Sequence, residues 1–198
     1  MLCSRAALLL LAWCVLGGAK ELTQHLRLGV NLLGGNTNAA QGKALRVCPG
    51  QRLVARVGYE ASNGAKVGGL SFKVQYNPSY FSLEGQARTD FDMKKCPIPF
   101  LSQLLKLDDE WSYVSFVCAD VSGAPVVQPK SDKVLELTLR VRDKHQGGET
   151  HIYLIANHKL HGKGFQYKTH NPQKGIQVAD ADSCLRQLDG KMQERKEL

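Results

Sequence analysis

Three stretches of the sequence hold residue types that can act as acids, bases or metal ligands. The acids at 108–110 are adjacent, so their side chains point in different directions and do not converge as a general acid and base. His158 and His161 lie in "NHKLHGKG", where neighbouring lysines repel a cation. The run "DADSC" at 180–184 lacks the glycine and the closing glutamate of a calcium loop. No Gly-X-Ser-X-Gly motif is present, so we expect a protein that is not an enzyme and uses no metal or cofactor.

The cysteines indicate an oxidising compartment and two disulfide bonds. Six are present, and two of them lie in an apolar N-terminal segment that we expect to be removed. The remaining four allow three pairings. We favour Cys96–Cys118, which ties a loop to the following strand, and Cys48–Cys184, which ties the start of the domain to its end. Zinc binding is disfavoured because no two of these cysteines have the close spacing of zinc ligands.

Residues 1–19 have the pattern of a secretory signal peptide. Arg5 precedes an apolar run at 6–16, which is too short to span a bilayer. Gly17 and Ala19 supply the small residues of a cleavage site before Lys20. We therefore expect a secreted, extracellular chain with no membrane span; an uncleaved anchor is the alternative interpretation of this segment.

A polar tail at 183–198 follows the domain that we predict at 20–182. Leu185, Leu188 and Met192 lie at helical intervals, so the tail can form a helix. Its last four residues, "RKEL", resemble an ER-retention signal of the Lys-Asp-Glu-Leu kind. Because Lys196 replaces an acid of that signal, we favour secretion over retention in the ER.

The chain is basic, with 26 Lys and Arg against 18 Asp and Glu and a formal net charge of +8. These residues are scattered, and some occupy alternate strand positions, as Lys73 and Arg140 do. The simplest interpretation is that these basic residues keep the protein soluble. The more specific interpretation is that they attract an acidic partner such as a sulfated polysaccharide. Without a nucleic-acid motif, we expect no nucleic-acid partner.

Period-two alternation of apolar residues indicates that the chain is mostly β-strand. Every second residue is apolar in "LSFKVQY" (70–76), and the same holds in "VLELTLRV" (134–141). Asn77-Pro78 ends the first of these strands in a corner, because Pro cannot donate to a ladder and Asn tolerates turn geometry. The side chains that we predict to be buried between two sheets are Phe72, Val74, Leu137 and Leu139.

One short helix is predicted at 100–107, where the apolar residues of "FLSQLLKL" fall at helical spacings just after Pro97 and Pro99. Turn signals separate about nine short strands, and there is no alternation of strands with long helices. The fold class is therefore all-β, a jelly-roll β-sandwich of about nine strands with one short helix.

Four blocks of the sequence resemble cohesin modules, in the family's order, between Cys48 and Leu154. "CPGQRLVARVGYE" is similar to the cohesin opening, a Pro-Gly turn followed by an alternating strand. "GGLSFKVQYNPSYFSLEG" resembles the stretch in which one strand ends in Tyr-Asp-Pro and the next follows at once, with Asn77 in the place of the Asp. "WSYVSFVCADVSG" resembles a later strand that ends in an acid and a small loop, and "VLELTLRVRDKHQGGETHIYL" resembles the closing hairpin.

The resemblance implies a nine-stranded jelly-roll sandwich that is shared with several carbohydrate-binding modules. Cohesins bind dockerin modules, so it also implies a protein partner. We expect a secreted, non-enzymatic module that binds a carbohydrate or an extracellular protein. The alternative is a structural adhesion or extracellular-matrix protein that assembles with itself or with a larger partner.

The ligand is expected on a sheet face, and not at the Asn77-Pro78 corner or in the His158–His161 loop. Related modules bind on sheet faces or their rims, and a rigid sheet loses little ordering entropy on contact. Aromatic rings also offer flat surfaces on which sugar rings stack. The candidate contacts are Tyr113, Tyr153 and Arg140, since alternation places each opposite a predicted core residue.

Overall fold

The structure is a computed structural model that describes residues 22–34, 44–64, 68–90, 98–106, 110–119, 130–143, 147–156, 165–171 and 175–186. These residues form twelve strands, a 3₁₀ turn at Ser62–Gly64 and a short helix at 181–186. The strands are β1 (Leu22–Leu32), β2 (Leu45–Val47), β3 (Arg52–Ala61), β4 (Gly69–Tyr76), β5 (Phe81–Leu83), β6 (Ile98–Lys106), β7 (Ser112–Ala119), β8 (Lys130–Val141), β9 (Gly148–Thr150), β10 (Ile152–Ala156), β11 (Phe165–His170) and β12 (Ile176–Val178).

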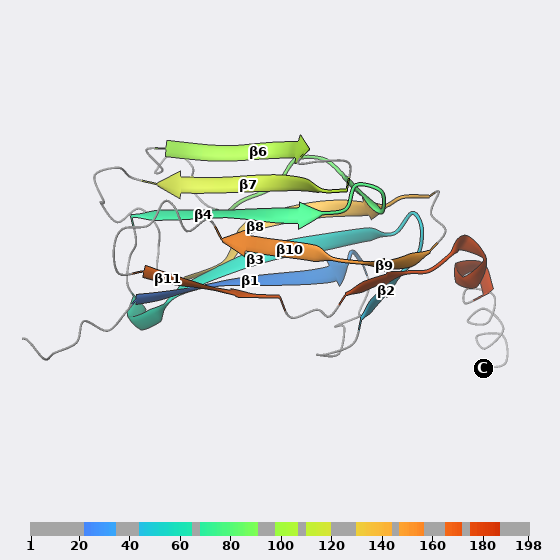
Figure 1. Ribbon diagram of the computed structural model, residues 1–198, viewed down its shortest axis with the longest axis horizontal. Coiled ribbons are helices and arrows are strands. Elements are labelled where there is room, and N and C mark those ends of the chain that lie inside the picture. The colour runs from blue at the N-terminus through green and yellow to red at the C-terminus, as the bar shows by residue number, and fades with distance from the viewer. Residues whose placement is uncertain are drawn as a thin grey trace, which may run out of the picture.

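Two main sheets lie face to face and make a β-sandwich (Figure 1). One has five strands in the order β11-β1-β3-β8-β5, and the other has four in the order β10-β4-β7-β6. A small sheet, β2-β12-β9, lies at one end of the molecule. The predicted all-β sandwich is therefore confirmed. The described strands exceed the predicted nine in part because the segment that was expected to form a helix is strand β6.

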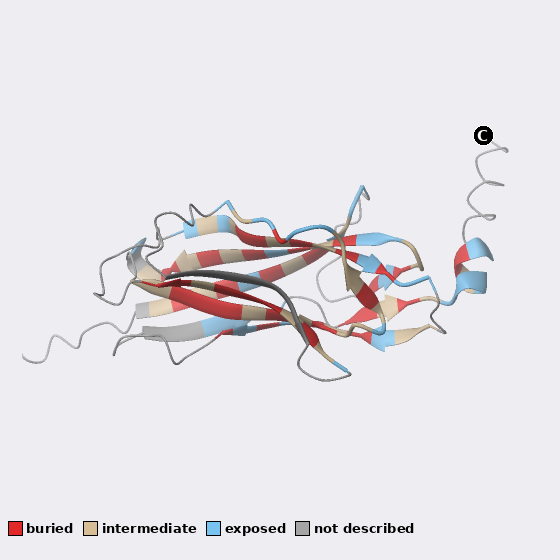
Figure 2. Cartoon of the chain, turned by 90° about the horizontal axis from the view of Figure 1, so that it is seen from above, coloured by how far each residue is buried: buried red, intermediate tan, exposed pale blue. Residues whose placement is uncertain are grey.

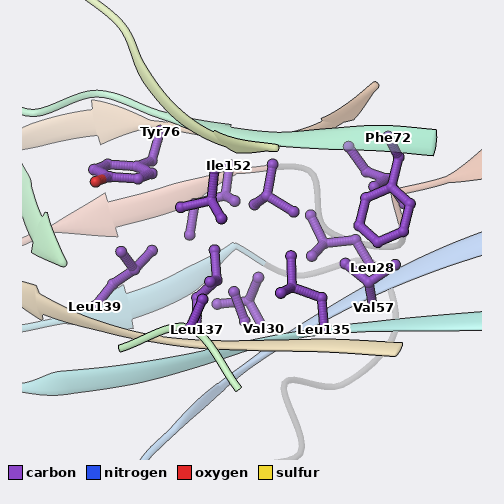
Figure 3. Packing of buried hydrophobic residues seen from close by; sticks show 14 of the residues in the cluster. Leu28, Val30, Val57, Phe72, Tyr76, Leu135, Leu137, Leu139 and Ile152 are labelled. Carbon is purple, nitrogen blue, oxygen red and sulfur yellow. The ribbon is translucent and has the colours of Figure 1, made fainter. Parts of the chain in front are cut away.

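The core fills the space between the two main sheets, and buried positions alternate along strands such as β3 and β10 (Figure 2). Phe72, Val74, Leu137 and Leu139 are each 0% exposed, which confirms the predicted inward face. Phe72 stacks on Phe116 of β7, with ring centroids 5.0 Å apart. Figure 3 shows the two inner faces meeting, with Phe72, Tyr76 and Ile152 from the four-stranded sheet and Leu135, Leu137 and Leu139 from the five-stranded sheet.

The Asn77-Pro78 corner takes the chain from one main sheet to the other. The Asn77 Oδ1 accepts a hydrogen bond from the Ser79 N–H at 2.8 Å, a bond typical of Asx turns. The Asn77 carbonyl accepts from the N–H groups of Tyr80 and Phe81, at 3.2 and 3.0 Å. The turn thus joins β4 of the four-stranded sheet to β5 of the five-stranded sheet, so the role of the corner is architectural.

The prediction of a helix at 100–107 is wrong, because residues Ile98–Lys106 form strand β6, which pairs antiparallel with β7. The register shifts between Ser102 and Leu105: Ser102 pairs with Ser115, whereas Leu105 pairs with Tyr113. The three-residue step on β6 thus faces a two-residue step on β7, which is the count of a β-bulge. An extra residue in a strand breaks the period of two, so the apolar residues of this strand fell at spacings that imitate a helix.

A disulfide bond joins Cys48 to Cys184, as predicted. Cys48 follows β2, and Cys184 lies in the helix at 181–186, which Asp180 caps. The Asp180 carboxylate accepts hydrogen bonds from the N–H and the hydroxyl of Ser183, both at 2.7 Å. These bonds hold the pKa of Asp180 below its usual value. The acids of "DADSC" therefore begin a helix.

Several predictions fall on residues outside the described ranges. Cys118 is disulfide-bonded, but its predicted partner Cys96 lies outside them. So do the signal segment at 1–19, both His158 and His161, and the end of the tail from 187 onward. Within the described ranges, no helix has the length and apolar character needed to cross a membrane.

Candidate functional site

An aromatic surface lies on the outer side of the four-stranded sheet. We define the aromatic face as Lys73, Trp111, Tyr113, Tyr153 and Ile155, which come from β4, from β7 and the residue before it, and from β10. Alternation turns these side chains outward, because their strand neighbours belong to the core. The register then places them side by side on neighbouring strands, with Gln75 between Tyr153 and Tyr113 and with Lys73 opposite Ile155.

The rings of this surface contact one another. Trp111 and Tyr153 have centroids 5.4 Å apart and planes inclined by 51°. Tyr153 also stacks on His151, with centroids 5.5 Å apart and planes within 6°. Tyr153 and Ile155 are 38% and 43% exposed, and they are two of only four exposed large hydrophobic residues in the described ranges. Two such residues on one strand of a rigid sheet make an apolar contact surface.

The charge of the aromatic face is positive. Lys73 Nζ lies 4.3 Å from the centroid of the Tyr113 ring, a cation–π arrangement. No carboxylate occupies an outward position of β4, β7 or β10 among the residues that the structure describes. At the border of the face, Glu149 Oε1 lies 3.7 Å from Nε2 of His151, the histidine that stacks on Tyr153. The face therefore suits a partner with apolar side chains and a carboxylate.

The outer side of the five-stranded sheet differs in charge from the aromatic face, because its arginines are paired with carboxylates. Pairs join Arg27 to Glu60, Arg52 to Glu84, Arg56 to Glu136 and Arg140 to Asp143, with N–O distances of 3.1, 2.6, 2.6 and 3.2 Å. Pairs in which both side chains are exposed contribute little stability each, and together the four pairs leave a polar, balanced surface. This side offers less apolar contact area than the aromatic face.

The structure brings together two of the three predicted ligand contacts. Tyr113 and Tyr153 belong to the aromatic face, whereas Arg140 lies on the opposite sheet. There Arg140 lines an open cleft of about 480 Å³ together with Leu33 and Arg52. Sequence reasoning missed Trp111 and Ile155, although both stand two residues from a predicted contact and so share its strand face.

Several described titratable groups outside the aromatic face have a pKa that differs from its ordinary value. Tyr59 and Tyr76 have buried hydroxyls without hydrogen-bond partners, and burial raises the pKa of both, that of Tyr76 to about 12. The pKa of His25 is lowered by partial burial and by the nearby charges of His170, Lys168 and Arg27. No three His, Cys, Asp or Glu residues among those described are grouped to hold a metal ion.

Comparison with models of known protein families gives a match that covers most of this sandwich. The profile of the cohesin domain matches residues 41–171, a segment that contains every strand of the two main sheets except β1. A search of curated protein sequences finds no match.

Similar solved structures include cohesins from several organisms. The seventh ScaB type I cohesin of Pseudobacteroides cellulosolvens is 12% identical, has a TM-score of 0.49, and the match covers 79% of this chain and 92% of that one. A type I cohesin–dockerin complex from Clostridium thermocellum is 13% identical with a TM-score of 0.48, over 80% and 99% of the two chains. A non-cellulosomal cohesin of Archaeoglobus fulgidus is 11% identical with a TM-score of 0.42, over 83% and 97%.

Proposed function

This chain belongs to the cohesin domain family, and from that premise we propose that it is a secreted, non-enzymatic module that binds a protein partner through the aromatic face. Cohesins are protein-binding modules, and their partners are dockerins. The partner of this chain is accordingly an extracellular protein that docks on the sheet β10-β4-β7-β6.

The observation that carries this proposal is the exposure of Tyr153 and Ile155 beside stacked rings on a rigid sheet. Aromatic residues are enriched in the centres of protein interfaces, where they bury a large area with few rotatable bonds. A sheet held on its inner side by a packed core loses little conformational entropy when a partner binds. Both properties favour recognition by this surface.

Lys73 defines the charge that the partner should carry. Its ammonium lies 4.3 Å from the centroid of the Tyr113 ring, and the outward positions of β4, β7 and β10 that the structure describes supply no acid to neutralise it. A partner carboxylate placed over Lys73 would form a charge-assisted hydrogen bond in a partly desolvated setting. We therefore expect an apolar partner patch with an Asp or Glu at its centre.

The test compares binding by variants of the two sheets. The partner is captured from the secreted proteins of the source cells, purified, and titrated calorimetrically against Tyr153→Ala, Lys73→Ala and Arg140→Ala. The first two should weaken binding by about tenfold or more, which corresponds to about 1.4 kcal/mol each. Arg140→Ala is the matched control on the opposite sheet and should bind like the parent. The reverse pattern, with Arg140→Ala alone impaired, would place the site on the five-stranded sheet and contradict the proposal.

A carbohydrate ligand is the second candidate, and the row formed by Trp111, Tyr153 and His151 favours it. Sugar rings stack on flat aromatic faces through their C–H groups. A glycan array read with the parent and with Tyr153→Ala separates the two candidates. Hits that disappear in the variant support a glycan on the same face, whereas a silent array supports the protein partner. Self-association detected by sedimentation would instead favour the adhesion or matrix role.

Secretion is supported by the disulfide chemistry of the domain, since Cys48–Cys184 and the bonded Cys118 require an oxidising compartment. Expression of the tagged chain in animal cells tests it. Most of the chain should appear in the medium, and changing the terminal "RKEL" should leave this fraction unchanged. A chain that stays in the ER until "RKEL" is altered would show that the tail acts as a retention signal.

A further inference from the structure

Two histidines that are far apart in the sequence meet at one edge of the five-stranded sheet. His25 lies in β1, and His170 ends β11, 145 positions later in the sequence. His25 Nδ1 lies 3.0 Å from His170 Nε2, and the ring centroids are 5.3 Å apart with planes inclined by 22°. This distance is that of a hydrogen bond, so one of the two nitrogens carries a proton and the other offers a lone pair.

We propose that this histidine pair is a pH-sensitive latch, which holds the edge strand β11 on β1 near neutral pH and releases it when both rings are protonated. In the neutral pair, the N–H of one ring donates to the other ring. A first added proton preserves this bond, because an imidazolium still donates to a neutral imidazole. A second added proton removes the last lone pair between the rings and places two cations in contact. The latch therefore opens on the second protonation and not on the first.

The cations beside the pair oppose its protonation. The parallel register sets Lys168 opposite His25 and Arg27 opposite His170, so each imidazole has a basic residue as its direct neighbour on the adjoining strand. All four residues lie on the same side of the sheet, because paired positions of neighbouring strands share a face. Two added protons would thus gather four positive charges at this edge.

One acid offsets these charges in part. Glu60 of β3 lies opposite His25 on the other side of β1, but it forms an ion pair of 3.1 Å with Arg27. Lys130 of β8 in turn lies opposite Glu60. Strand β10 of the other sheet also contacts β11, and its one titratable residue, Tyr153, is uncharged at acidic pH. The elements around the pair therefore supply more positive than negative charge.

The pH range of the latch follows from the sign of the effect. Partial burial, and after it the charges of His170, Lys168 and Arg27, lower the pKa of His25 below its usual value of 6.5. The folded pair therefore binds protons less readily than the same histidines in an opened strand. The stability that the latch contributes is fully present above pH 6.5 and is lost as the pH falls through the lowered pKa.

The opening should be confined to the edge strand. Among the described strands, β1 is the only partner of β11 in the sheet. Strand β1 itself stays held on its other side, where it pairs with β3 from Gln24 to Leu32. At the far edge of the same sheet, β5 contains no histidine and serves as an internal reference.

The test follows hydrogen exchange of the backbone amides in the purified full chain between about pH 7.5 and about pH 5, the range over which imidazole changes its charge. Protection is expressed relative to an unstructured chain at the same pH. Protection of β11 in the parent should fall by about tenfold or more, since each extra proton bound by the open strand changes the opening equilibrium by up to about tenfold per pH unit. Protection of β5 should change little over the same range.

Variants of the two rings test whether they act as one unit. His25→Gln and His170→Gln should each remove most of the acid-induced loss of protection in β11, and the double variant should remove little more than either one. His151→Gln removes a histidine on the other sheet and is the matched control, so it should behave like the parent. Near-UV circular dichroism at neutral pH shows that each variant keeps the fold.

A charge variant tests the latch with both rings in place. Lys168→Glu sets a carboxylate beside His25 and stabilises the protonated pair, so β11 should open at a lower pH than in the parent. The proposal is overturned if β11 and β5 lose protection together in the parent, if both single histidine variants keep the full acid response, if His151→Gln removes it, or if Lys168→Glu opens β11 at a higher pH.

Discussion

Removing the Cys48–Cys184 bridge should destabilise the chain mainly through its unfolded state. The variant is Cys48→Ala with Cys184→Ala, which leaves no free thiol. In the folded state the two ends are held together even without the bridge, because β2 pairs in parallel with β12. The Ala179 N–H also donates to the Val47 carbonyl at 2.9 Å. The native fold should therefore be nearly unchanged.

The magnitude follows from the length of chain that the bridge closes. The two cysteines are 136 residues apart, and in the chain-entropy model a loop of that length lowers the entropy of the unfolded chain by about 17 cal/mol/K. At 25 °C this is about 5 kcal/mol, a large part of the roughly 5–15 kcal/mol that stabilises a typical domain. The dependence on length is logarithmic, so the predicted Cys96–Cys118 bridge, which would shorten the loop, would change the value only slightly.

Equilibrium unfolding in urea measures this effect. The midpoint should fall markedly, and the m-value should rise, because an unfolded chain without the bridge exposes more surface. Near-UV circular dichroism of the folded variant should match the parent and so verify the native packing. A loss below about 1 kcal/mol with an unchanged m-value would refute the entropic reasoning.

Three further predictions test the core, a helix cap and a surface ion pair. Phe72→Ala should lower the free energy of unfolding by about 3–5 kcal/mol in urea titrations, whereas Gln75→Ala, on the outer side of the same strand, should change it little. The folded pKa of Asp180 is below its ordinary value of 3.8, so its capping bonds stabilise the helix above that pH and are lost as the pH falls through the lowered pKa. The protection of the Ser183 amide from hydrogen exchange, relative to an unstructured chain at the same pH, should therefore fall in this pH range. An Asp180→Asn variant that shows the same pH response would contradict the assignment. Glu60→Gln removes an ion pair with Arg27 in which both side chains are exposed, so it should cost less than about 1 kcal/mol, with a difference from the parent that shrinks in high salt. A larger, salt-independent loss would show that this pair is not a screened surface contact.

The positions that sequence reasoning placed well are those where the period of a strand is undisturbed. Phe72 and Leu137 lie within uninterrupted alternating runs, and each is fully buried as predicted. Tyr113 and Tyr153 were assigned to the outer side by the same rule, and both lie there. Alternation is a local property of extended backbone, so it can be read without knowledge of which strands are neighbours.

The same rule failed where the strand itself is irregular. At 100–107 the bulge between Ser102 and Leu105 shifts the apolar residues by one position, and a helix was predicted in place of β6. The bulge is defined by the strand opposite it, since it exists only as a mismatch in step length between β6 and β7. A single segment of sequence therefore could not reveal it.

The sequence by itself determined the all-β class, the inward faces of the long strands and the corner at Asn77-Pro78, because each follows from the backbone preferences of a few consecutive residues. Only the tertiary structure decided which outward residues act together. It placed Tyr153 in contact with both Trp111 and His151, and it separated Arg140 from them. It also brought His170 to His25 across 145 residues. Strand order and register depend on how all the apolar faces are buried at once, and that collective condition cannot be read from any one stretch of the chain.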